Sequence, residues 1–206
     1  MPGSGTESIV VDNLSIDMLA TLFTSAARAH VLKLFMLDPR RAYYQRQIEA
    51  ATGLPIRAVQ RELERLSALG LLYRHSEGNR AYYQVDMLFP LFPELRGLVL
   101  KTCTDVERIR GILSIDESVR LAFLNPDADR VLVVTGAGVR PNLRGLGEVQ
   151  TEIMTVDEFT AALADPPESL RSMLTAGEDL LGRRDDVVWR RIEAAGFDVR
   201  KGEGVA

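Results

Sequence analysis

The chain has very few of the residues that build metal sites and covalent cross-links. It contains one cysteine, Cys103, and two histidines, His30 and His75, among 206 residues. A single cysteine excludes a disulfide within one chain, and cysteine and histidine do not cluster at metal-ligand spacing. We therefore expect no structural zinc, no other bound metal and no cofactor.

Long hydrophobic runs are also missing, although 46% of the residues are hydrophobic. No run approaches the roughly 18 apolar residues that a membrane-spanning helix needs. Residues 1–13 lack the basic start, apolar centre and small-residue cleavage pattern of a secretory signal. We therefore expect a cytoplasmic protein that does not bind membranes, with a disordered N-terminus at 1–14 and a flexible tail at 199–206.

Charge is distributed unevenly along the sequence. Residues 19–84 contain ten Lys and Arg against five Asp and Glu, a net charge of +5. Residues 85–206 contain fifteen against twenty-one, a net charge of −6. A basic segment followed by an acidic one is typical of a nucleic-acid-binding domain linked to a second domain. The length of the chain is sufficient for two small domains.

The basic segment predicts three helices. Ser25 is a good N-cap for the first, which extends to the Asp38-Pro39 pair. A second helix is predicted over 43–51, with inward-facing Ile48 and Ala51, and ends near Gly53. Pro55 suits the first turn of a third helix, because proline has no backbone donor to leave unsatisfied there. Two helices joined by a tight glycine turn form a helix-turn-helix.

The third helix has two contrasting faces. Its apolar residues Val59, Leu63, Leu66 and Leu69 are spaced four, three and three apart and form one face. Arg and Gln lie on the opposite face, where Arg matches the acceptors of guanine and Gln matches adenine. We therefore expect this helix to read the major groove of DNA. A solvated surface would show the same pattern, so the next segment decides between the two.

A β-hairpin with a basic tip follows directly. Residues 71–76 and 80–85 alternate as strands do, and Glu77-Gly78-Asn79 provides the turn between them. Behind a recognition helix, such a hairpin is the wing of a winged helix, whose basic residues reach phosphates or the minor groove. Tyr82 and Tyr83 are interpreted as packing residues. The predicted DNA contacts are Tyr44, Gln45, Arg46, Pro55, Ile56, Arg57, Gln60, Arg61, Arg65, Arg74, Asn79 and Arg80.

The segment from Leu22 to Thr102 resembles the ArsR-like winged-helix regulators whose C-terminal half is a minimal nucleotidyltransferase-type domain. The resemblance is carried by "YYQRQIEAATGLPIRAVQRELERL", "GNRAYYQ" and "LFPELRGLVLKT". It implies binding to an operator, expected to be palindromic, as a homodimer. The Cys-x-Cys pair of the metal-sensing members has no counterpart in this sequence, so metal sensing is not expected.

Residues 89–114 are predicted to form a linker and a long dimerisation helix. Apolar positions there repeat at alternating spacings of three and four, which is the heptad pattern of a helix that packs along a partner. A helix folded back on the chain's own core would show the same pattern, and this alternative stays open. The predicted dimer seam consists of Phe92, Leu95, Val99, Thr102, Val106, Ile109 and Leu113.

Residues 115–198 alternate between strand and helix patterns. Strands are predicted over 119–124, 131–135 and 149–154, and helices over 156–164, 168–176 and 185–195. This region is similar to the nucleotidyltransferase half of the family, in which a Gly-Ser turn and an Asp-x-Asp motif hold nucleotide and magnesium. Asp127-Ala128-Asp129 is present here, but the Gly-Ser turn is missing. The resemblance therefore implies a degenerate domain without catalytic residues.

The sequence predicts an α+β protein with a winged helix-turn-helix at 15–88, a dimerisation helix at 89–114 and a small α/β domain at 115–198. Its expected function is sequence-specific regulation of transcription, with an unidentified effector possible at the C-terminal domain. Two alternatives remain. One is a DNA-tethered nucleotidyltransferase that uses Asp127 and Asp129 on Mg²⁺. The other is an adaptor whose acidic half recruits a protein partner.

Overall fold

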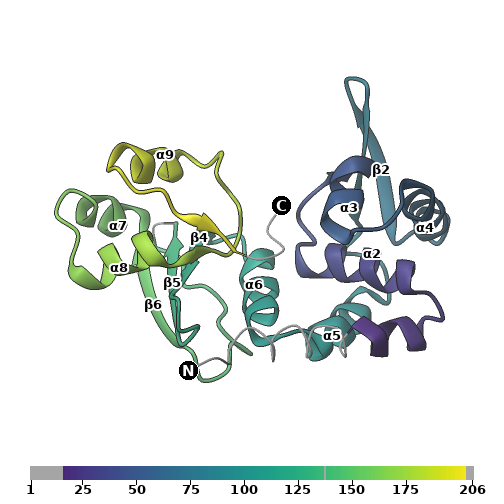
Figure 1. Ribbon diagram of the computed structural model, residues 1–206, viewed down its shortest axis with the longest axis horizontal. Coiled ribbons are helices and arrows are strands. Elements are labelled where there is room, and N and C mark those ends of the chain that lie inside the picture. The colour runs from purple at the N-terminus through teal and green to yellow at the C-terminus, as the bar shows by residue number, and fades with distance from the viewer. Residues whose placement is uncertain (1–15, 137, 203–206) are drawn as a thin grey trace. The chain divides into compact units, whose positions relative to one another are not determined.

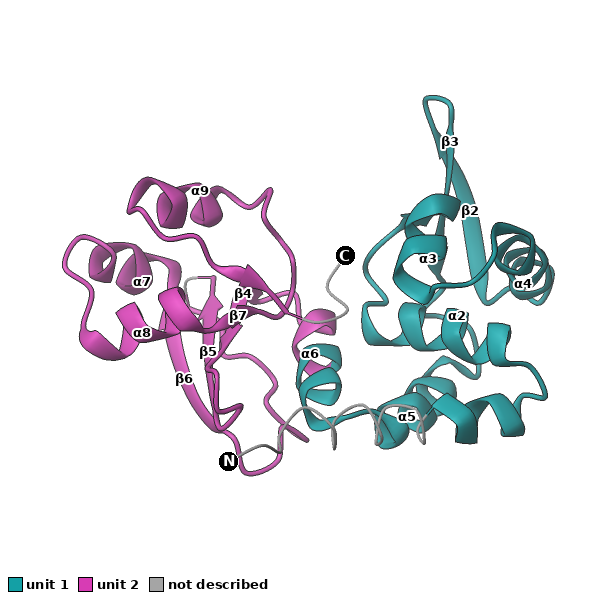
Figure 2. Ribbon diagram, viewed as in Figure 1, with its two compact units in different colours: residues 1–111 teal, residues 112–206 magenta. Residues whose placement is uncertain are grey.

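Residues 16–136 and 138–202 are described by the computed structural model. The fold is mixed α+β, as predicted. The chain divides into two units, residues 1–111 and residues 112–206 (Figure 2). The predicted disorder at 1–14, and the predicted flexible tail from residue 203 onwards, lie outside the described residues. Among the helices that are described, none is long and apolar enough to cross a membrane.

Helix boundaries in the first unit follow from local sequence signals. The Ser25 hydroxyl accepts a hydrogen bond from the backbone N–H of Arg28 at 3.2 Å, which caps the helix that begins at Ala26. Gly53 adopts a φ of 67°, a left-handed conformation that glycine tolerates, and this ends the next helix. The helices between residues 26 and 68 are α2 (Ala26–Leu37), α3 (Gln45–Thr52) and α4 (Ile56–Ala68), as Figure 1 shows.

A three-stranded antiparallel sheet in the order β1-β3-β2 belongs to the same unit. Its strands are β1 (Tyr43–Tyr44), β2 (Leu72–Glu77) and β3 (Arg80–Val85). β2 and β3 form the predicted hairpin, which extends past α3 (Figure 1). The prediction that Tyr43 and Tyr44 begin the second helix is wrong. They form a strand instead, because they pair with Tyr83 and Tyr82 of β3.

Most of the predicted inward positions of α3 and α4 are confirmed. Ile48, Val59 and Leu63 are fully buried, and Leu66 is nearly so. Ala51 is exposed, contrary to the prediction. Leu69 is 61% exposed because it follows the last residue of α4 rather than continuing its apolar face.

The predicted long helix over Phe92 to Leu113 is wrong, because the structure has two helices there. These are α5 (Phe92–Thr102) and α6 (Asp105–Ile115). At the break, the Thr104 hydroxyl accepts from the Glu107 backbone N–H at 3.3 Å, and the Glu107 carboxylate accepts from the Thr104 N–H at 3.2 Å. This reciprocal pair is a capping box, which starts a new helix and interrupts the heptad pattern.

The side chains of the predicted dimer seam are largely enclosed by the chain itself. Phe92, Val99, Ile109 and Leu113 are buried, and Leu95 and Val106 are half-buried. Thr102 donates its hydroxyl to the Val99 carbonyl of its own helix at 2.9 Å. The alternative interpretation, in which this region folds onto its own core, therefore fits the structure, and a coiled-coil seam does not.

The second unit contains a five-stranded mixed sheet in the order β6-β5-β4-β7-β8. The strands are β4 (Val119–Leu124), β5 (Arg130–Thr135), β6 (Gln150–Thr155), β7 (Glu178–Asp179) and β8 (Arg200–Lys201). The two short strands β7 and β8 were not predicted. Because β8 pairs with β7 and Val199 is buried, the predicted flexible tail is wrong for residues 199–202.

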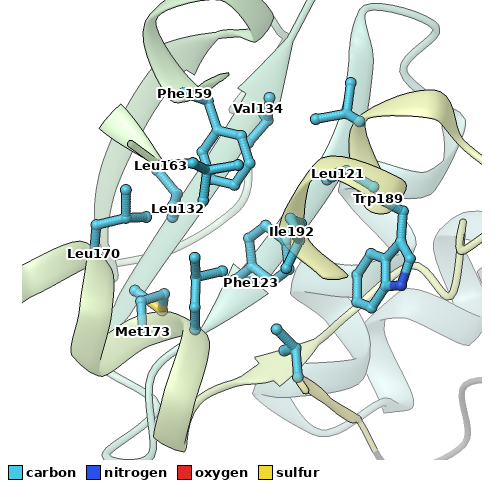
Figure 3. Packing of buried hydrophobic residues seen from close by; sticks show 13 residues of the cluster. Leu121, Phe123, Leu132, Val134, Phe159, Leu163, Leu170, Met173, Trp189 and Ile192 are labelled. Atoms are coloured by element: carbon cyan, nitrogen blue, oxygen red, sulfur yellow. The ribbon is translucent and has the colours of Figure 1, made fainter. Parts of the chain in front are cut away.

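Three helices contribute to the core of the second unit: α7 (Val156–Ala162), α8 (Glu168–Ala176) and α9 (Val187–Ala194). Phe123 of β4 lies at the centre of this core, with its ring centroid 6.1 Å from that of Phe159 and 6.2 Å from that of Trp189 (Figure 3). The predicted capping box between Thr155 and Glu158 at the start of α7 is confirmed.

Candidate nucleic-acid interface

The outward face of α4 is polar and exposed. Arg57, Gln60, Arg61 and Glu64 line a shallow surface depression of about 450 Å³. Val59 and Leu63, on the opposite face of α4, are fully buried and so fix the rotation of the helix. At the N-terminus of α4, Pro55 is exposed and Ile56 is half-buried. The helix therefore presents long polar side chains on a rigidly held backbone.

Four arginines of the first unit have no carboxylate within ion-pair distance among the described residues. Within the described parts of the chain, Arg46, Arg57, Arg61 and Arg74 form no ion pair, and all four are exposed. Uncompensated guanidinium groups attract phosphates, and the same groups can donate two parallel hydrogen bonds to guanine. This part of the first unit is therefore electrostatically suited to a polyanion.

Unlike the exposed polar side chains of α4, Glu62 is buried. It accepts from Arg28 of α2 at 3.0 Å and from Arg65 of α4 at 2.8 Å. This pair of contacts was not predicted from the sequence, since Arg28 and Glu62 are far apart in the chain. Arg65 is held by Glu62 and is thus less available to DNA than Arg57 and Arg61.

The hairpin also carries exposed polar groups. Arg74, Asn79 and Arg80 are exposed, and the guanidinium of Arg80 lies 4.8 Å from the ring centroid of Tyr44. A cation over an aromatic face is attracted by the ring, so Arg80 is restrained beside the first turn of α3. The hairpin arginine and the start of α3 therefore act as one surface.

The two tyrosines interpreted as packing residues make internal contacts. Tyr83 is buried, and Tyr82 stacks on His75 with 5.7 Å between the ring centroids. Tyr82 also meets Tyr44 edge to face at 5.7 Å. His75 and Tyr82 are paired in the middle of the hairpin, so these contacts stiffen it between its base and its tip.

The N-terminus of α3 contacts α4 through a side-chain hydrogen bond. Gln45, the first residue of α3, accepts from the Gln60 amide at 3.2 Å. The start of α3 is itself fixed, because the Gln47 side chain accepts from the Tyr44 backbone N–H at 3.1 Å. All the residues predicted to contact DNA thus lie on the N-termini of α3 and α4, the outward face of α4 or the hairpin.

The two aspartates of the Asp-x-Asp motif lie in the turn between β4 and β5. Asn125 accepts from the backbone N–H groups of Asp129 and Arg130 at 3.1 and 2.8 Å, and it donates to the Asp129 carboxylate at 2.8 Å. Asp129 is therefore held within the turn by Asn125, whereas Asp127 is not part of these contacts, and both aspartates are exposed. In the described ranges, no three His, Cys, Asp or Glu gather where they could hold a metal ion.

One carboxylate of the second unit is fully buried. Asp179 accepts from the backbone N–H groups of Leu181 and Gly182, each at 3.0 Å, and lies 3.6 Å from Arg184. Burial raises the pKa of Asp179 above its usual value, while the two backbone hydrogen bonds and Arg184 act in the opposite direction. These contacts tie β7 to the loop that follows it, which is a structural role.

No protein-family model matches the chain, and no curated protein or solved structure matches it.

Proposed function

We propose that the first unit is a winged helix-turn-helix of the ArsR-like type and that the chain is a sequence-specific regulator of transcription. In this proposal α4 is the recognition helix, and the hairpin of β2 and β3 is the wing. The observation that carries the proposal is the exposed row on α4, in which Arg57 and Arg61 flank Gln60 without an ion pair to any described residue.

Two different kinds of DNA contact are proposed. Arg57 and Gln60 lie on the outward face near the N-terminus of α4, where a helix in the major groove meets base edges. Arg74 and Arg80 lie on the hairpin and bind phosphates, which position the protein without reading sequence. Arg46, at the start of α3, belongs with the phosphate contacts.

We further propose that the protein binds its operator as a homodimer, because one recognition helix reads only a short half-site and a two-fold dimer reads two. The predicted seam is buried, so it does not supply the contact. Leu88 is 91% exposed and Leu91 is 56% exposed, and both lie in the segment between β3 and α5. Exposed apolar surface is a common feature of protein contacts, and in this proposal these two leucines contact the second copy.

The second unit is proposed to be a degenerate nucleotidyltransferase-like domain that serves assembly or the sensing of an effector. Phosphoryl-type transfer needs carboxylates that converge on metal ions and a cradle for the phosphates. The engagement of Asp129 within its own turn, together with the missing Gly-Ser turn, supports a non-catalytic role.

Selection from random duplex DNA tests this function. Pure protein is mixed with random duplexes, and the retained fragments are sequenced. We expect one enriched, palindromic motif, and we expect Arg57→Ala/Arg61→Ala to abolish the enrichment. Arg190→Ala serves as the matched control, because Arg190 is an exposed arginine on a helix of the second unit. Retention without any enriched motif would contradict sequence-specific binding.

A further inference from the structure

Gln60 is held in a defined orientation by a residue from another helix. Its Nε2 donates to Oε1 of Gln45 at 3.2 Å, across fifteen positions of sequence. The two side chains can meet because α3 and α4 are anchored by the buried residues Ile48 and Val59 and joined by the tight turn at Gly53. The position of Gln45 is fixed in turn, since it is the first residue of a capped helix.

This hydrogen bond distinguishes the two ends of the Gln60 amide. A primary amide has two N–H donors and one carbonyl acceptor. With one N–H donated to Gln45, the carbonyl and the second N–H of Gln60 remain at the exposed surface of α4. The opposite amide orientation would use the carbonyl to bind residue 45 and leave only donors at the surface.

An adjacent acceptor and donor match one base in the major groove. Adenine presents a donor at N6 and an acceptor at N7, whereas guanine presents acceptors at both N7 and O6. An amide with its carbonyl exposed is complementary to adenine and places an acceptor against an acceptor at guanine. The orientation of the Gln60 amide therefore determines whether its exposed groups match adenine or guanine.

We infer that Gln45 is a positioning residue that holds the amide of Gln60 so that Gln60 selects adenine over guanine at one position of the DNA site. The inference deepens the proposed function and rests on DNA binding by α4. Gln45 acts through Gln60, so its substitution changes the base preference at the position that Gln60 reads. A contact from Gln45 to a phosphate would instead change affinity for all sequences equally.

The experiment measures base preference at a single position. Gln60→Ala first identifies that position, as the one where selected duplexes lose their preference. The dissociation constants of duplexes carrying adenine or guanine there are then compared for wild type, Gln45→Ala, Gln45→Glu and Gln45→Lys. Gln150→Ala is the control, since Gln150 is an exposed glutamine in the second unit. Each result is the ratio of the dissociation constants of the two duplexes. A charge added at position 45 that changes binding to both duplexes equally therefore leaves this ratio unchanged.

In wild type we expect adenine to be preferred by about tenfold, the size of one good bidentate contact. Gln45→Ala should lower this ratio severalfold, and Gln45→Glu should keep it because a carboxylate also accepts from Nε2. Gln45→Lys should reverse it, because an ammonium donor binds the Gln60 carbonyl and turns the amide over. Gln45→Glu is also compatible with folding, since a carboxylate is favourable in the first turn of a helix.

Two negative results separate this inference from the proposed function. If wild type selects no sequence at all, DNA reading by α4 fails and the inference fails with it. If wild type selects a motif but the three Gln45 variants keep the same ratio, or lower affinity for all duplexes equally, only the positioning role of Gln45 is wrong.

Discussion

Glu62 of α4 and Arg28 of α2 form an ion pair of 3.0 Å in which the glutamate side chain is only 4% exposed. Arg28 also donates to the Phe23 carbonyl at 3.3 Å, so the pair joins the turn before α2, α2 itself and α4. Glu62 thereby holds the helix that carries Arg57 and Gln60. The neighbouring Glu64 is exposed and lines the outward face.

Glu62→Ala should therefore destabilise the protein. Its removal leaves the guanidinium of Arg28 without its carboxylate acceptor, at an expected cost of about 1–3 kcal/mol in the free energy of unfolding. Urea denaturation measures this value. Glu64→Ala is the matched control and should stay within about 0.5 kcal/mol of wild type, as surface substitutions do. Equal losses for the two variants would refute the anchoring role of Glu62.

Dimerisation should depend on the exposed apolar turn rather than on the predicted helix seam. Leu88→Lys/Leu91→Lys removes apolar surface that is already exposed, so we expect a folded monomer that binds a palindromic site poorly. Sedimentation velocity reports the mass. Val99→Lys, by contrast, buries an ammonium in the core and should unfold the unit. A double variant that stays dimeric would place the contact elsewhere.

Asp179 should make stability depend on pH in a direction opposite to that of a carboxylate whose pKa is lowered on folding. Burial raises the pKa of Asp179, so the folded chain holds this proton more tightly than the unfolded chain does. Its contribution to stability is therefore largest at low pH and is lost as the pH rises through the raised pKa. Asp179→Asn cannot titrate, so its unfolding free energy relative to wild type should increase between about pH 4 and about pH 7.

The control for this measurement is Asp185→Asn, an exposed aspartate close to Arg184 in sequence. It should show a nearly constant difference from wild type over the same interval. A constant difference for Asp179→Asn as well would show that the protonation state of Asp179 does not change on folding.

The second unit should not transfer nucleotides. Pure protein is incubated with each labelled nucleoside triphosphate, Mg²⁺ or Mn²⁺, and candidate acceptors, and we expect no labelled product. The Asp129 carboxylate accepts from Asn125 within its own turn. Among the described residues, neither Asp127 nor Asp129 belongs to a group of three side chains that could hold a metal ion. Transfer by wild type that disappears in Asp127→Ala/Asp129→Ala would instead establish the enzyme alternative.

Local signals predicted much of the fold. β4 and α8 match their predicted residues, and α2 and α4 begin next to their predicted caps, because strand alternation and capping act over a few residues. β1, β7 and β8 were missed, since strands of two residues have no recognisable period and depend on a distant partner. The break between α5 and α6 did have a signal, the Thr104 and Glu107 capping box, which the heptad pattern obscured.

The candidate site was predictable only in part for the same reason. The outward positions of Arg57, Gln60 and Arg61 follow from the period of a single helix. The ion pair of Glu62 with Arg28 and the hydrogen bond between Gln45 and Gln60 cross between helices, so they require the three-dimensional arrangement. The exposed surface of α4 was therefore predictable from the sequence, but the contacts that orient it were not.

The most direct test of DNA reading compares Arg57→Ala with Arg80→Ala on the selected duplex and on single-base variants of it, at several salt concentrations. Arg57→Ala should cost about 1–3 kcal/mol in binding free energy and relax specificity at one position. Arg80→Ala should weaken binding to all sequences alike and lower the slope of log K against log salt by about one. If instead Arg57→Ala binds every duplex as wild type does, α4 does not read DNA and the account is wrong.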